Sequence, residues 1–398
     1  MKTLSELALN VKASTTMAID AKAKQMRAEG IDVVGFGAGE PDFKTPDNIS
    51  MAAINAICSG KTKYTPASGL LELKKAVCNS LKRDLDLNYL PTNINVSDGA
   101  KPIVYISLRV LLNPGDEVIL PAPYWVSYLE MIKMTGGVPK IISADKNQGF
   151  KVSAKQVEAA ITEKTKCIIL NNPCNPSGAV YSRKELNEIA DICVNNDIYI
   201  ISDEIYYELL YNEENFTSIA SLSHEIQEHT ILVNGVSKSY AMTGWRIGYC
   251  ASNETISKVI SNYLSHSTGS PCSISQWASV EALNGDQSSV KAMRDEFKKR
   301  RDYMANAINN ITGVSCEKPD GAFYIMMNLD EVIGKSIDGV VITSSDDFAE
   351  KFLEKELVAI VPCTGFGFPN YVRWSYATSM ENIQIGMKRL EKFVLSLK

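Results

Sequence analysis

A lysine stands within a run of small and apolar residues from Gly235 to Gly248, which reads GVSKSYAMTGWRIG. In such surroundings Lys238 loses its positive charge more easily than a surface lysine, and a neutral amine can attack a carbonyl carbon. Arg246 follows in the same run and offers a planar fork that suits phosphate or carboxylate. The run indicates amine chemistry on an anionic ligand, although most lysines in proteins are solvated surface groups.

Three more groups of polar or small residues follow predicted strands. Asp203 ends an apolar strand, where a buried ionised carboxylate needs a cation, and Tyr206 comes three residues later. Asn175 lies between two prolines in a rigid loop. Gly99 and Ala100 precede a predicted helix whose first amides can hold an anion. Each group also has an ordinary structural interpretation as an N-cap, a turn filler or a strand-to-helix turn.

The elements that must position these residues are short apolar strands alternating with helical stretches. The pattern predicts an α/β fold with a mostly parallel central sheet covered on both faces. The predicted strands are 33–36, 95–97, 117–120, 140–143, 167–170, 197–202, 230–234 and 247–251. The predicted helices are 46–59, 69–85, 101–112, 124–135, 153–160, 182–195 and 286–310. Ligands of such sheets bind beyond the carboxyl ends of the strands, where the polar groups lie.

The C-terminal part of the chain predicts a smaller α+β unit, with strands at 321–328, 358–362 and 371–375. A length of 398 residues also favours two domains over one. The run of charges from Lys298 to Arg301 lies on a long predicted helix, and we expect it to form a solvated face.

Composition excludes several classes of function. With 45% apolar and 22% charged residues the chain is an ordinary globular protein, and a net charge of −5 disfavours nucleic-acid binding. Nine scattered cysteines predict reduced thiols of the cytosol, and residues 1–14 lack the apolar core of a secretory signal. The segment His224–His229 is one residue longer than the zinc motif H-E-x-x-H, so we expect no metal site. The most apolar helical candidate, 103–112, is short and contains Arg109, so we expect no membrane partner.

The glycine-rich segment Gly35–Gly39 could form a dinucleotide-binding loop, which would make the protein a dehydrogenase. That loop must open directly into a helix, and here an extended stretch with Pro41 and Pro46 follows instead. The sequence therefore disfavours a dinucleotide site.

At these positions the sequence resembles the class I aminotransferases, fold-type I enzymes that depend on pyridoxal 5′-phosphate. Residues 235–248 fit the lysine signature of that family at every constrained position. Six further blocks match the family in order, namely 39–43, 63–66, 123–128, 175–178, 202–206 and 373–377. The resemblance extends over nearly the whole chain, and the sequence is most similar to the bacterial and plant aspartate aminotransferase branch, which includes prephenate aminotransferases. It implies a large coenzyme-binding domain of residues 46–285 and a small domain of residues 1–45 with 286–398.

The resemblance also implies how the coenzyme is held. Lys238 carries it as a Schiff base and moves the proton of the reaction, while Asp203 pairs with the pyridinium nitrogen. Asn175 and Tyr206 hydrogen-bond the phenolic oxygen, and Trp125 stacks on the ring.

The phosphate of the coenzyme has its own expected partners. These are Arg246 and the residues Gly99, Ala100 and Lys101, with Tyr64 reaching the same phosphate from a neighbouring subunit. The expected assembly is therefore a homodimer.

The substrate is expected to bind through its carboxylates. Arg373 holds the α-carboxylate with help from the backbone of Gly39, and Trp125 and Asn175 also contact the substrate. In the resembling branch, Lys101 together with Ser14 and Thr16 receives the distal carboxylate of dicarboxylic substrates.

These residues favour an aspartate aminotransferase that passes the amino group of L-aspartate to 2-oxoglutarate by a ping-pong route. Prephenate suits the same residues, and an aromatic aminotransferase, a C–S lyase or a non-catalytic regulator are the alternatives. The chain departs from the branch at Gly235, where relatives carry a phosphate-binding serine, at Pro102, which could shift Lys101, and at Cys174, which has no assigned role.

Overall fold

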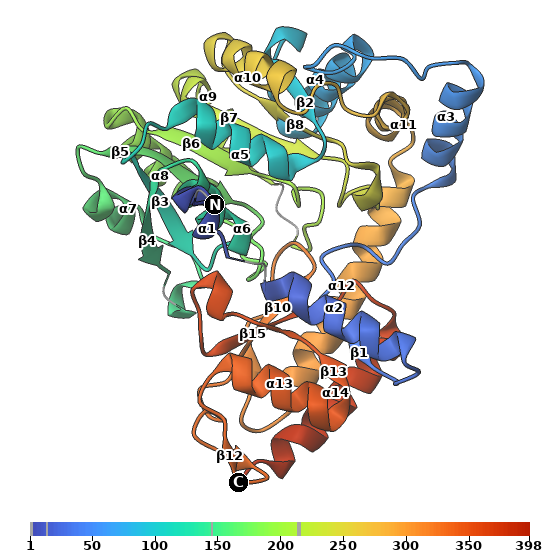
Figure 1. Cartoon of the computed structure of the whole chain (residues 1–398), viewed down its shortest axis with the longest axis vertical. Helices are drawn as coiled ribbons and strands as arrows, with labels where there is room; N and C mark the ends of the chain where they lie inside the picture. The colour runs from blue at the N-terminus through green and yellow to red at the C-terminus, as the bar shows by residue number, and fades with distance from the viewer. Residues whose placement is uncertain (1–2, 13–14, 145, 213–215) are drawn as a thin grey trace.

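The computed structural model describes residues 3–12, 15–144, 146–212 and 216–398. Figure 1 shows an upper part built around one large sheet and a lower part built mainly from the C-terminal third of the chain. Among the described residues, no helix is long and apolar enough to cross a membrane.

The large sheet contains seven strands in the order β2-β8-β7-β6-β5-β3-β4. Their bounds are β2 Ile94–Ser97, β3 Glu117–Ala122, β4 Val138–Ser143, β5 Thr165–Asn171, β6 Tyr199–Asp203, β7 Thr230–Gly235 and β8 Gly248–Ala251. Only β8 runs antiparallel to its neighbours in this sheet, so the prediction of a mostly parallel sheet is confirmed. The central strands are continuous apolar runs because helices bury both of their faces.

Two groups of helices cover this sheet. The bounds are α3 Asp47–Cys58, α4 Leu71–Leu85, α5 Ala100–Leu111, α6 Val126–Met134, α7 Ala154–Ala160, α8 Arg183–Asn195, α9 His224–His229, α10 Glu254–His266 and α11 Ser273–Asn284. One face packs its apolar side chains against α5, α6 and α10, and the other packs against α3, α4, α11 and, further along, α7 to α9. All seven predicted helices are present with bounds shifted by no more than a few residues, whereas α9, α10 and α11 of this group were not predicted.

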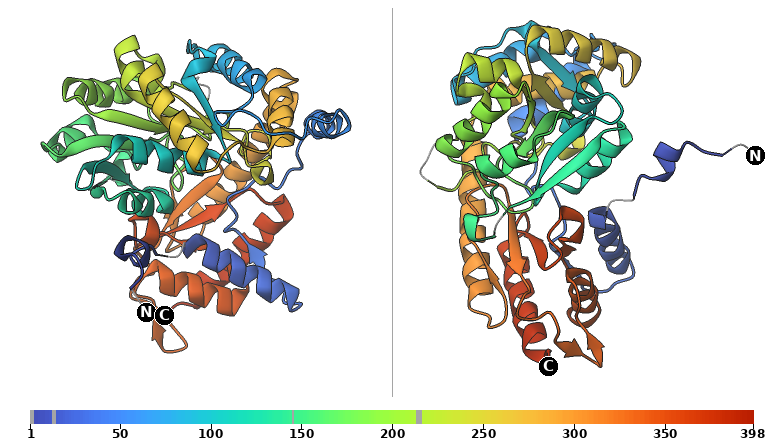
Figure 2. Two further views of the ribbon diagram at one scale, coloured as in Figure 1. Left: turned by 45° about the horizontal axis from the view of Figure 1, so that its top comes forward. Right: turned by 90° about the vertical axis from the view of Figure 1, so that its left-hand side faces the viewer.

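The lower part of the molecule contains a four-stranded antiparallel sheet in the order β14-β15-β10-β9. Its strands are β9 Ser315–Cys316, β10 Tyr324–Asn328, β14 Val361–Pro362 and β15 Tyr371–Ser375, and its helices are α12 Ser288–Asn309, α13 Ser345–Glu356 and α14 Met380–Ser396. The remaining elements are α1 Glu6–Leu9, α2 Thr15–Ala28, β1 Val34–Gly35, β11 Ser336–Ile337, β12 Val340–Val341 and β13 Val358–Ala359. The predicted smaller α+β unit is thus present, and Figure 2 shows α2 lying against its C-terminal helices.

The first predicted strand belongs to this lower part. Strand β1 pairs in parallel with β13, far along the chain, and not with the seven-stranded sheet. Residues 37–46 then run upward to α3 along the boundary between the two sheets. The domain boundaries at residues 46 and 286 remain predictions.

The charged run on α12 corrects an expectation. Lys298 and Lys299 are exposed as predicted, but Arg300 and Arg301 are 7% and 4% exposed. Both arginines lie on the apolar face of the helix, beside the buried residues Phe297 and Met304. The charge pattern alone could not show this, because an arginine can bury its stem and guanidinium wherever acceptors and aromatic rings meet it.

Candidate active site

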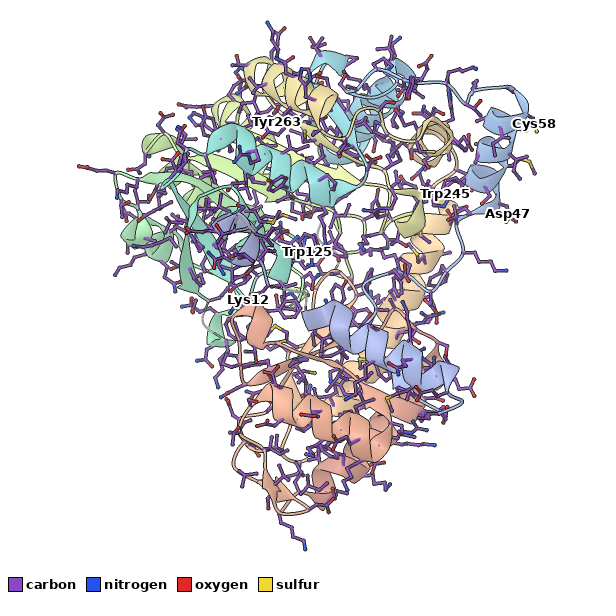
Figure 3. The ribbon with its side chains drawn as sticks, in the orientation of Figure 1. Lys12, Asp47, Cys58, Trp125, Trp245 and Tyr263 are labelled. Carbon is purple, nitrogen blue, oxygen red and sulfur yellow. The ribbon has the colours of Figure 1, made fainter. Side chains whose placement is uncertain are left out.

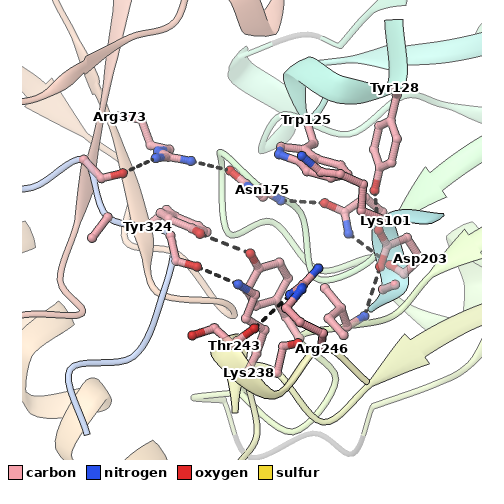
Figure 4. A pocket seen from close by; sticks show the side chains of 18 residues that line it. Lys101, Trp125, Tyr128, Asn175, Asp203, Lys238, Thr243, Arg246, Tyr324 and Arg373 are labelled. Carbon is pink, nitrogen blue, oxygen red and sulfur yellow. Dashed lines mark hydrogen bonds between the residues drawn. The ribbon is translucent and has the colours of Figure 1, made fainter. Parts of the chain in front are cut away.

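A cavity of about 280 Å³ opens where the carboxyl ends of the large-sheet strands meet the lower part of the molecule. Figure 3 places Trp125 on the side of the large sheet that faces the lower part, and Figure 4 shows the cavity from close by. The lining residues are Gly37, Ala38, Gly39, Ala100, Lys101, Trp125, Tyr128, Asn171, Asn175, Asp203, Ile205, Tyr206, Ser237, Lys238, Thr243, Arg246, Tyr324 and Arg373. The structure therefore brings ten of the fourteen predicted site residues to one cavity.

Asp203 is the last residue of β6, and it is 4% exposed. Its carboxylate accepts a hydrogen bond from the Tyr128 hydroxyl at 2.6 Å and another from the Ile205 amide at 3.2 Å. Burial raises the pKa of Asp203, and these two donors oppose that rise. Both donors are neutral, so the carboxylate keeps its affinity for a cationic donor arriving from the cavity.

Lys238 lies on the loop that follows β7, and its Nζ donates to the carbonyl oxygen of Gly39 at 2.5 Å. Burial lowers the pKa of Lys238 to about 8, and the positive charges of Arg246 and Arg373 act in the same direction. The negative charges of Glu40 and Asp203 oppose the change. An appreciable fraction of this amine is neutral near pH 8, which agrees with the prediction from its apolar surroundings.

Two arginines lie at opposite ends of the cavity, and the contacts of each are neutral. Arg373, in the middle of β15, is 3% exposed and donates to Asn175 Oδ1 at 3.0 Å and to the Gly37 carbonyl at 2.8 Å. Its Nε is buried and has no partner among the described residues. Arg246 donates to the carbonyl oxygens of Thr243 at 2.8 Å and Asp98 at 3.2 Å. Carbonyl acceptors fix the direction of each guanidinium without neutralising it, so both ends of the cavity attract anions.

The start of α5 packs against Arg246 through residues without side-chain bulk. Gly99 has a φ of +102°, and a Cβ at this position would lie 2.5 Å from Arg246 Nη2. A Cβ at Gly248 would lie 2.2 Å from the backbone nitrogen of Ala100. The first amides of α5 and one guanidinium are thereby brought together, which is an arrangement suited to phosphate.

The walls of the cavity carry aromatic rings. Lys101 Nζ lies 4.8 Å from the centre of the Trp125 ring, and burial lowers the pKa of this lysine. The hydroxyls of Tyr206 and Tyr324 are hydrogen-bonded at 3.1 Å. Burial raises the pKa of Tyr206 well above its ordinary value, so this residue is a hydroxyl donor and not a phenolate.

Four of the predicted residues do not line the cavity. Gly99 touches it only through Arg246, and Tyr64 is fully exposed at a separate surface hollow beside Cys272. Ser14 lies outside the described residues, and Thr16 belongs to α2 with a side chain that is likewise outside them.

A side chain at Gly235 would place Cβ 2.8 Å from the Ile247 carbonyl, so the backbone here leaves no room for the serine of the resembling family.

Several cavity residues had no role in the sequence-based prediction. Tyr128 stands three positions after Trp125 on a predicted helix, a spacing that puts both on one face and could have indicated a shared site. Tyr324 and Thr243 gave no such signal, because only the packing of the lower sheet and of the loop after β7 brings them to the cavity.

The residues present fit pyridoxal 5′-phosphate. A buried carboxylate suits a protonated ring nitrogen, Trp125 offers an aromatic face, and an amine of lowered pKa suits an aldehyde. The cradle of small residues at the start of α5, in which a Cβ would clash with Arg246, suits the phosphate.

Comparisons with known proteins agree with this donor set. The family described as aminotransferase class I and II matches residues 31–390. An aspartate aminotransferase of a Bacillus species is 49% identical over 381 residues, covering 96% of each chain. An aspartate/prephenate aminotransferase of Cereibacter sphaeroides is 43% identical over 399 residues, covering 100% of each chain.

Solved structures agree as well. The aspartate aminotransferase of Rhizobium meliloti superposes with a TM-score of 0.96 at 38% identity, covering 100% of both chains. That of Thermus thermophilus, solved with maleate, gives a TM-score of 0.93 at 39% identity, covering 98% of this chain and 100% of the other. The chain belongs to the aminotransferase class I and II family and is a pyridoxal-phosphate-dependent transaminase.

Proposed function

We propose that this transaminase passes the amino group of L-aspartate to 2-oxoglutarate, giving oxaloacetate and L-glutamate in two half-reactions at one site. One observation carries the proposal: a single cavity holds an amine whose pKa is about 8, a buried carboxylate and two arginines with neutral partners. Arg246 and Asp203 suit the phosphate and the ring nitrogen of the coenzyme, and Arg373 and Lys101 in the same cavity are left for the two carboxylates of the substrate.

The protein's own groups divide the work. Arg373 binds the α-carboxylate of the substrate through its guanidinium, which Asn175 and the Gly37 carbonyl already orient. Lys238 Nζ removes the proton from the substrate Cα and would deliver it to C4′ of the coenzyme. A pKa of about 8 allows this amine to act as a base near neutral pH. The coenzyme, when bound, supplies an electron sink for the carbanion.

Asp203 keeps the electron sink effective. Its carboxylate is oriented by Tyr128 and Ile205, and it would hold a proton on the ring nitrogen. Tyr206 would donate its hydroxyl to the phenolic oxygen, Arg246 and the start of α5 would hold the phosphate, and Trp125 would cover the ring.

The second carboxylate of the substrate is assigned to Lys101. This lysine is at the first turn of α5 with Nζ over the Trp125 ring, inside the same cavity. The relatives named aspartate aminotransferase, and the Thermus thermophilus structure with the dicarboxylate maleate, support a dicarboxylic substrate. The prediction that Ser14 and Thr16 contribute to this subsite is retained in the proposal.

Prephenate is the second candidate substrate. It also carries two carboxylates, and the relative from Cereibacter sphaeroides, which matches over the full chain, bears both names. The neutral acceptors around Arg373 suit the carboxylate of either compound.

We also propose a homodimer in the cytosol. Tyr64 is fully exposed and does not line its own cavity, which suits a residue that completes a neighbouring site. Met51, Ile54 and Ile57 are each at least half exposed on α3, which stands at the edge of the molecule between Asp47 and Cys58 in Figure 3. Light scattering at micromolar concentration tests the dimer, and a monomeric mass would contradict it.

All nine cysteines are free thiols, which suits a reducing compartment.

The decisive experiment is a screen of amino donors and keto acceptors with purified protein, prephenate included. We expect the highest kcat/KM for aspartate with 2-oxoglutarate. Lys101→Ala should reduce kcat/KM for aspartate by at least about tenfold more than for alanine, because only aspartate has a distal carboxylate to lose its partner. Lys75→Ala, on the exposed side of α4, is the control and should change neither value. Equal losses on both donors would contradict the assignment of Lys101.

A further inference from the structure

Residues 37–45 form a wall segment between the lower sheet and α3. Its first residues line the cavity, where the Gly37 carbonyl accepts from Arg373 at 2.8 Å and the Gly39 carbonyl accepts from Lys238 at 2.5 Å. Figure 4 draws these contacts of Arg373 and Lys238 as dashed lines. The direction of two functional side chains therefore depends on where this backbone lies.

The wall segment is joined to α12 by a buried arginine. The Arg300 side chain is 8% exposed; its Nη1 lies 2.7 Å from Asp42 Oδ1, and its Nε lies 3.1 Å from Glu296 Oε1. Its guanidinium also lies 5.1 Å from the centre of the Phe43 ring and 5.7 Å from that of Phe297. One side chain thus holds two consecutive residues of the segment, one by charge and one by its flat face.

Phe43 and Phe297 add a direct contact. Their ring centres are 5.4 Å apart at an interplanar angle of 87°, the edge-to-face arrangement that aromatic pairs prefer. Removing the guanidinium would leave Asp42 without this cation and would open a gap beside both rings. Because Arg300 is buried, its ion pair is screened less by solvent than the surface pairs of this chain.

Further hydrogen bonds join the segment to the loop that carries Lys238. Thr45 Oγ1 donates to the Ala241 carbonyl at 2.8 Å and accepts from Trp245 Nε1 at 2.9 Å, while Thr243 donates to Glu40 at 2.8 Å. These bonds join the segment to that loop and not to α12. Arg300 is the charged contact that ties the segment to the rigid 22-residue helix α12.

We propose that Arg300 is a positioning residue of the active site, which acts through Asp42 and Phe43 to hold the wall segment so that the Gly37 and Gly39 carbonyls orient Arg373 and Lys238. Its effect on substrate binding rests on the proposed function, in which Arg373 receives the substrate carboxylate. Its effect on the position of the wall segment does not depend on that function.

Arg301 provides a matched control. It is on the same helix, is equally buried, donates to the Pro319 carbonyl at 2.9 Å and lies 4.8 Å from the Tyr211 ring centre. None of these partners belongs to the wall segment. Arg300→Met and Arg301→Met therefore both remove a buried arginine from α12, and only the first releases the segment.

The first measurement needs no substrate. Lys44 is exposed, so trypsin can cut the Lys44–Thr45 bond whenever the segment opens locally. At a temperature where both variants are folded by circular dichroism, we expect Arg300→Met to be cut at this bond at least about tenfold faster than the parent protein. Arg301→Met should be cut at the parent rate. Equal rates for the two variants would overturn the proposal.

The second measurement separates positioning from general destabilisation. Arg300→Met should raise KM for aspartate about tenfold while kcat falls less, and Arg301→Met should leave KM unchanged. Asp42→Asn should reproduce the KM effect, and the double variant should add little to it, because both changes break one connection. Additive effects would overturn the proposal.

Arg300→Lys covers the case in which Arg300→Met does not fold. A lysine keeps the positive charge beside Asp42 but loses the contact with Glu296 and the flat face against Phe43. The cleavage rate and KM of Arg300→Lys should therefore lie between those of the parent and Asp42→Asn. Parent values for both Arg300→Lys and Asp42→Asn would also contradict the proposal. If the cleavage result holds while aspartate proves a poor substrate, the proposed function fails and the positioning of the segment stands.

Discussion

The two sides of the cavity are built in different ways. On one side, Asn171 and Asp203 are register partners at the ends of β5 and β6, and Lys238 follows the next strand, so the hydrogen-bond ladder of the large sheet sets their spacing. On the other side, Gly37 and Arg373 come from segments more than 300 residues apart, and side-chain contacts join them. The ladder of a sheet contains many equivalent backbone hydrogen bonds, whereas a connection through side chains depends on only a few contacts.

This difference teaches which changes should stay local. Removing one side chain from the sheet side should delete its chemistry and leave its neighbours in place. Removing one from the other side should also displace the residues that it contacts, so that substrate binding weakens and the positions of neighbouring groups change. Lys238 belongs to both sides, since it is placed by β7 and donates to Gly39.

The largest expected effect is at Lys238. Lys238→Ala removes the amine that holds the coenzyme and moves the proton, so turnover should fall by at least about 10⁴-fold for every donor. The absorbance of the covalently bound coenzyme should disappear as well, and Lys75→Ala should keep both. Substantial activity in Lys238→Ala would remove the basis of the proposed mechanism.

Arg373→Met tests the other side of the cavity. Loss of a buried guanidinium that binds a carboxylate should cost about 2–5 kcal/mol in kcat/KM, and the loss should be of similar size for aspartate and alanine, which share the α-carboxylate. Arg389→Met is the control. This change on α14 breaks the pair between Arg389 and Asp32, and we expect it to have no effect on kcat/KM. A loss confined to aspartate would exchange the roles of Arg373 and Lys101.

The pH dependence of Lys238 sharpens the comparison at the point where the two sides meet. A lowered pKa means that the neutral amine is present above about pH 8 and is lost as the pH falls below it. Reductive methylation of protein freed of coenzyme should therefore label Lys238 about 100-fold faster at pH 7 than the lysine of an added model peptide, whose amine has the ordinary lysine pKa. Mass spectrometry of each peptide across pH 6 to 11 measures both curves; coincident curves would contradict the lowered pKa.

The smallest expected effect is at Tyr128. Tyr128→Phe removes one hydroxyl donor from Asp203 but leaves the ladder of β6 intact, so kcat should fall only about tenfold. Because this hydrogen bond lowers the pKa of Asp203, the acidic limb of the pH–rate profile should move to higher pH. Tyr181→Phe, which loses a bond from the Val152 amide, should keep the parent profile. An unshifted limb in Tyr128→Phe would show that Tyr128 does not tune Asp203.

The order of strands and helices could be predicted from the sequence because it is a local property. Apolar runs such as 167–170 and 198–202 are long enough to indicate buried strands, and strand ends then mark where Asp203 and Lys238 emerge. The prediction failed where the chain leaves that pattern. Strand 33–36 reads like the others, yet it pairs with β13, because pairing partners are chosen by long-range packing.

The sequence by itself determined the chemical identity of the site: an amine in apolar surroundings, a carboxylate at the end of a buried strand, and an arginine, Arg246, within a loop of small residues. These are properties of residue type and of near neighbours. Only the tertiary structure decided that Tyr128 supports Asp203, that Tyr64 is exposed outside its own cavity, and that Arg300 is buried against Asp42. Such contacts join segments far apart in the chain, and their free energy depends on distance and burial, which no local pattern encodes.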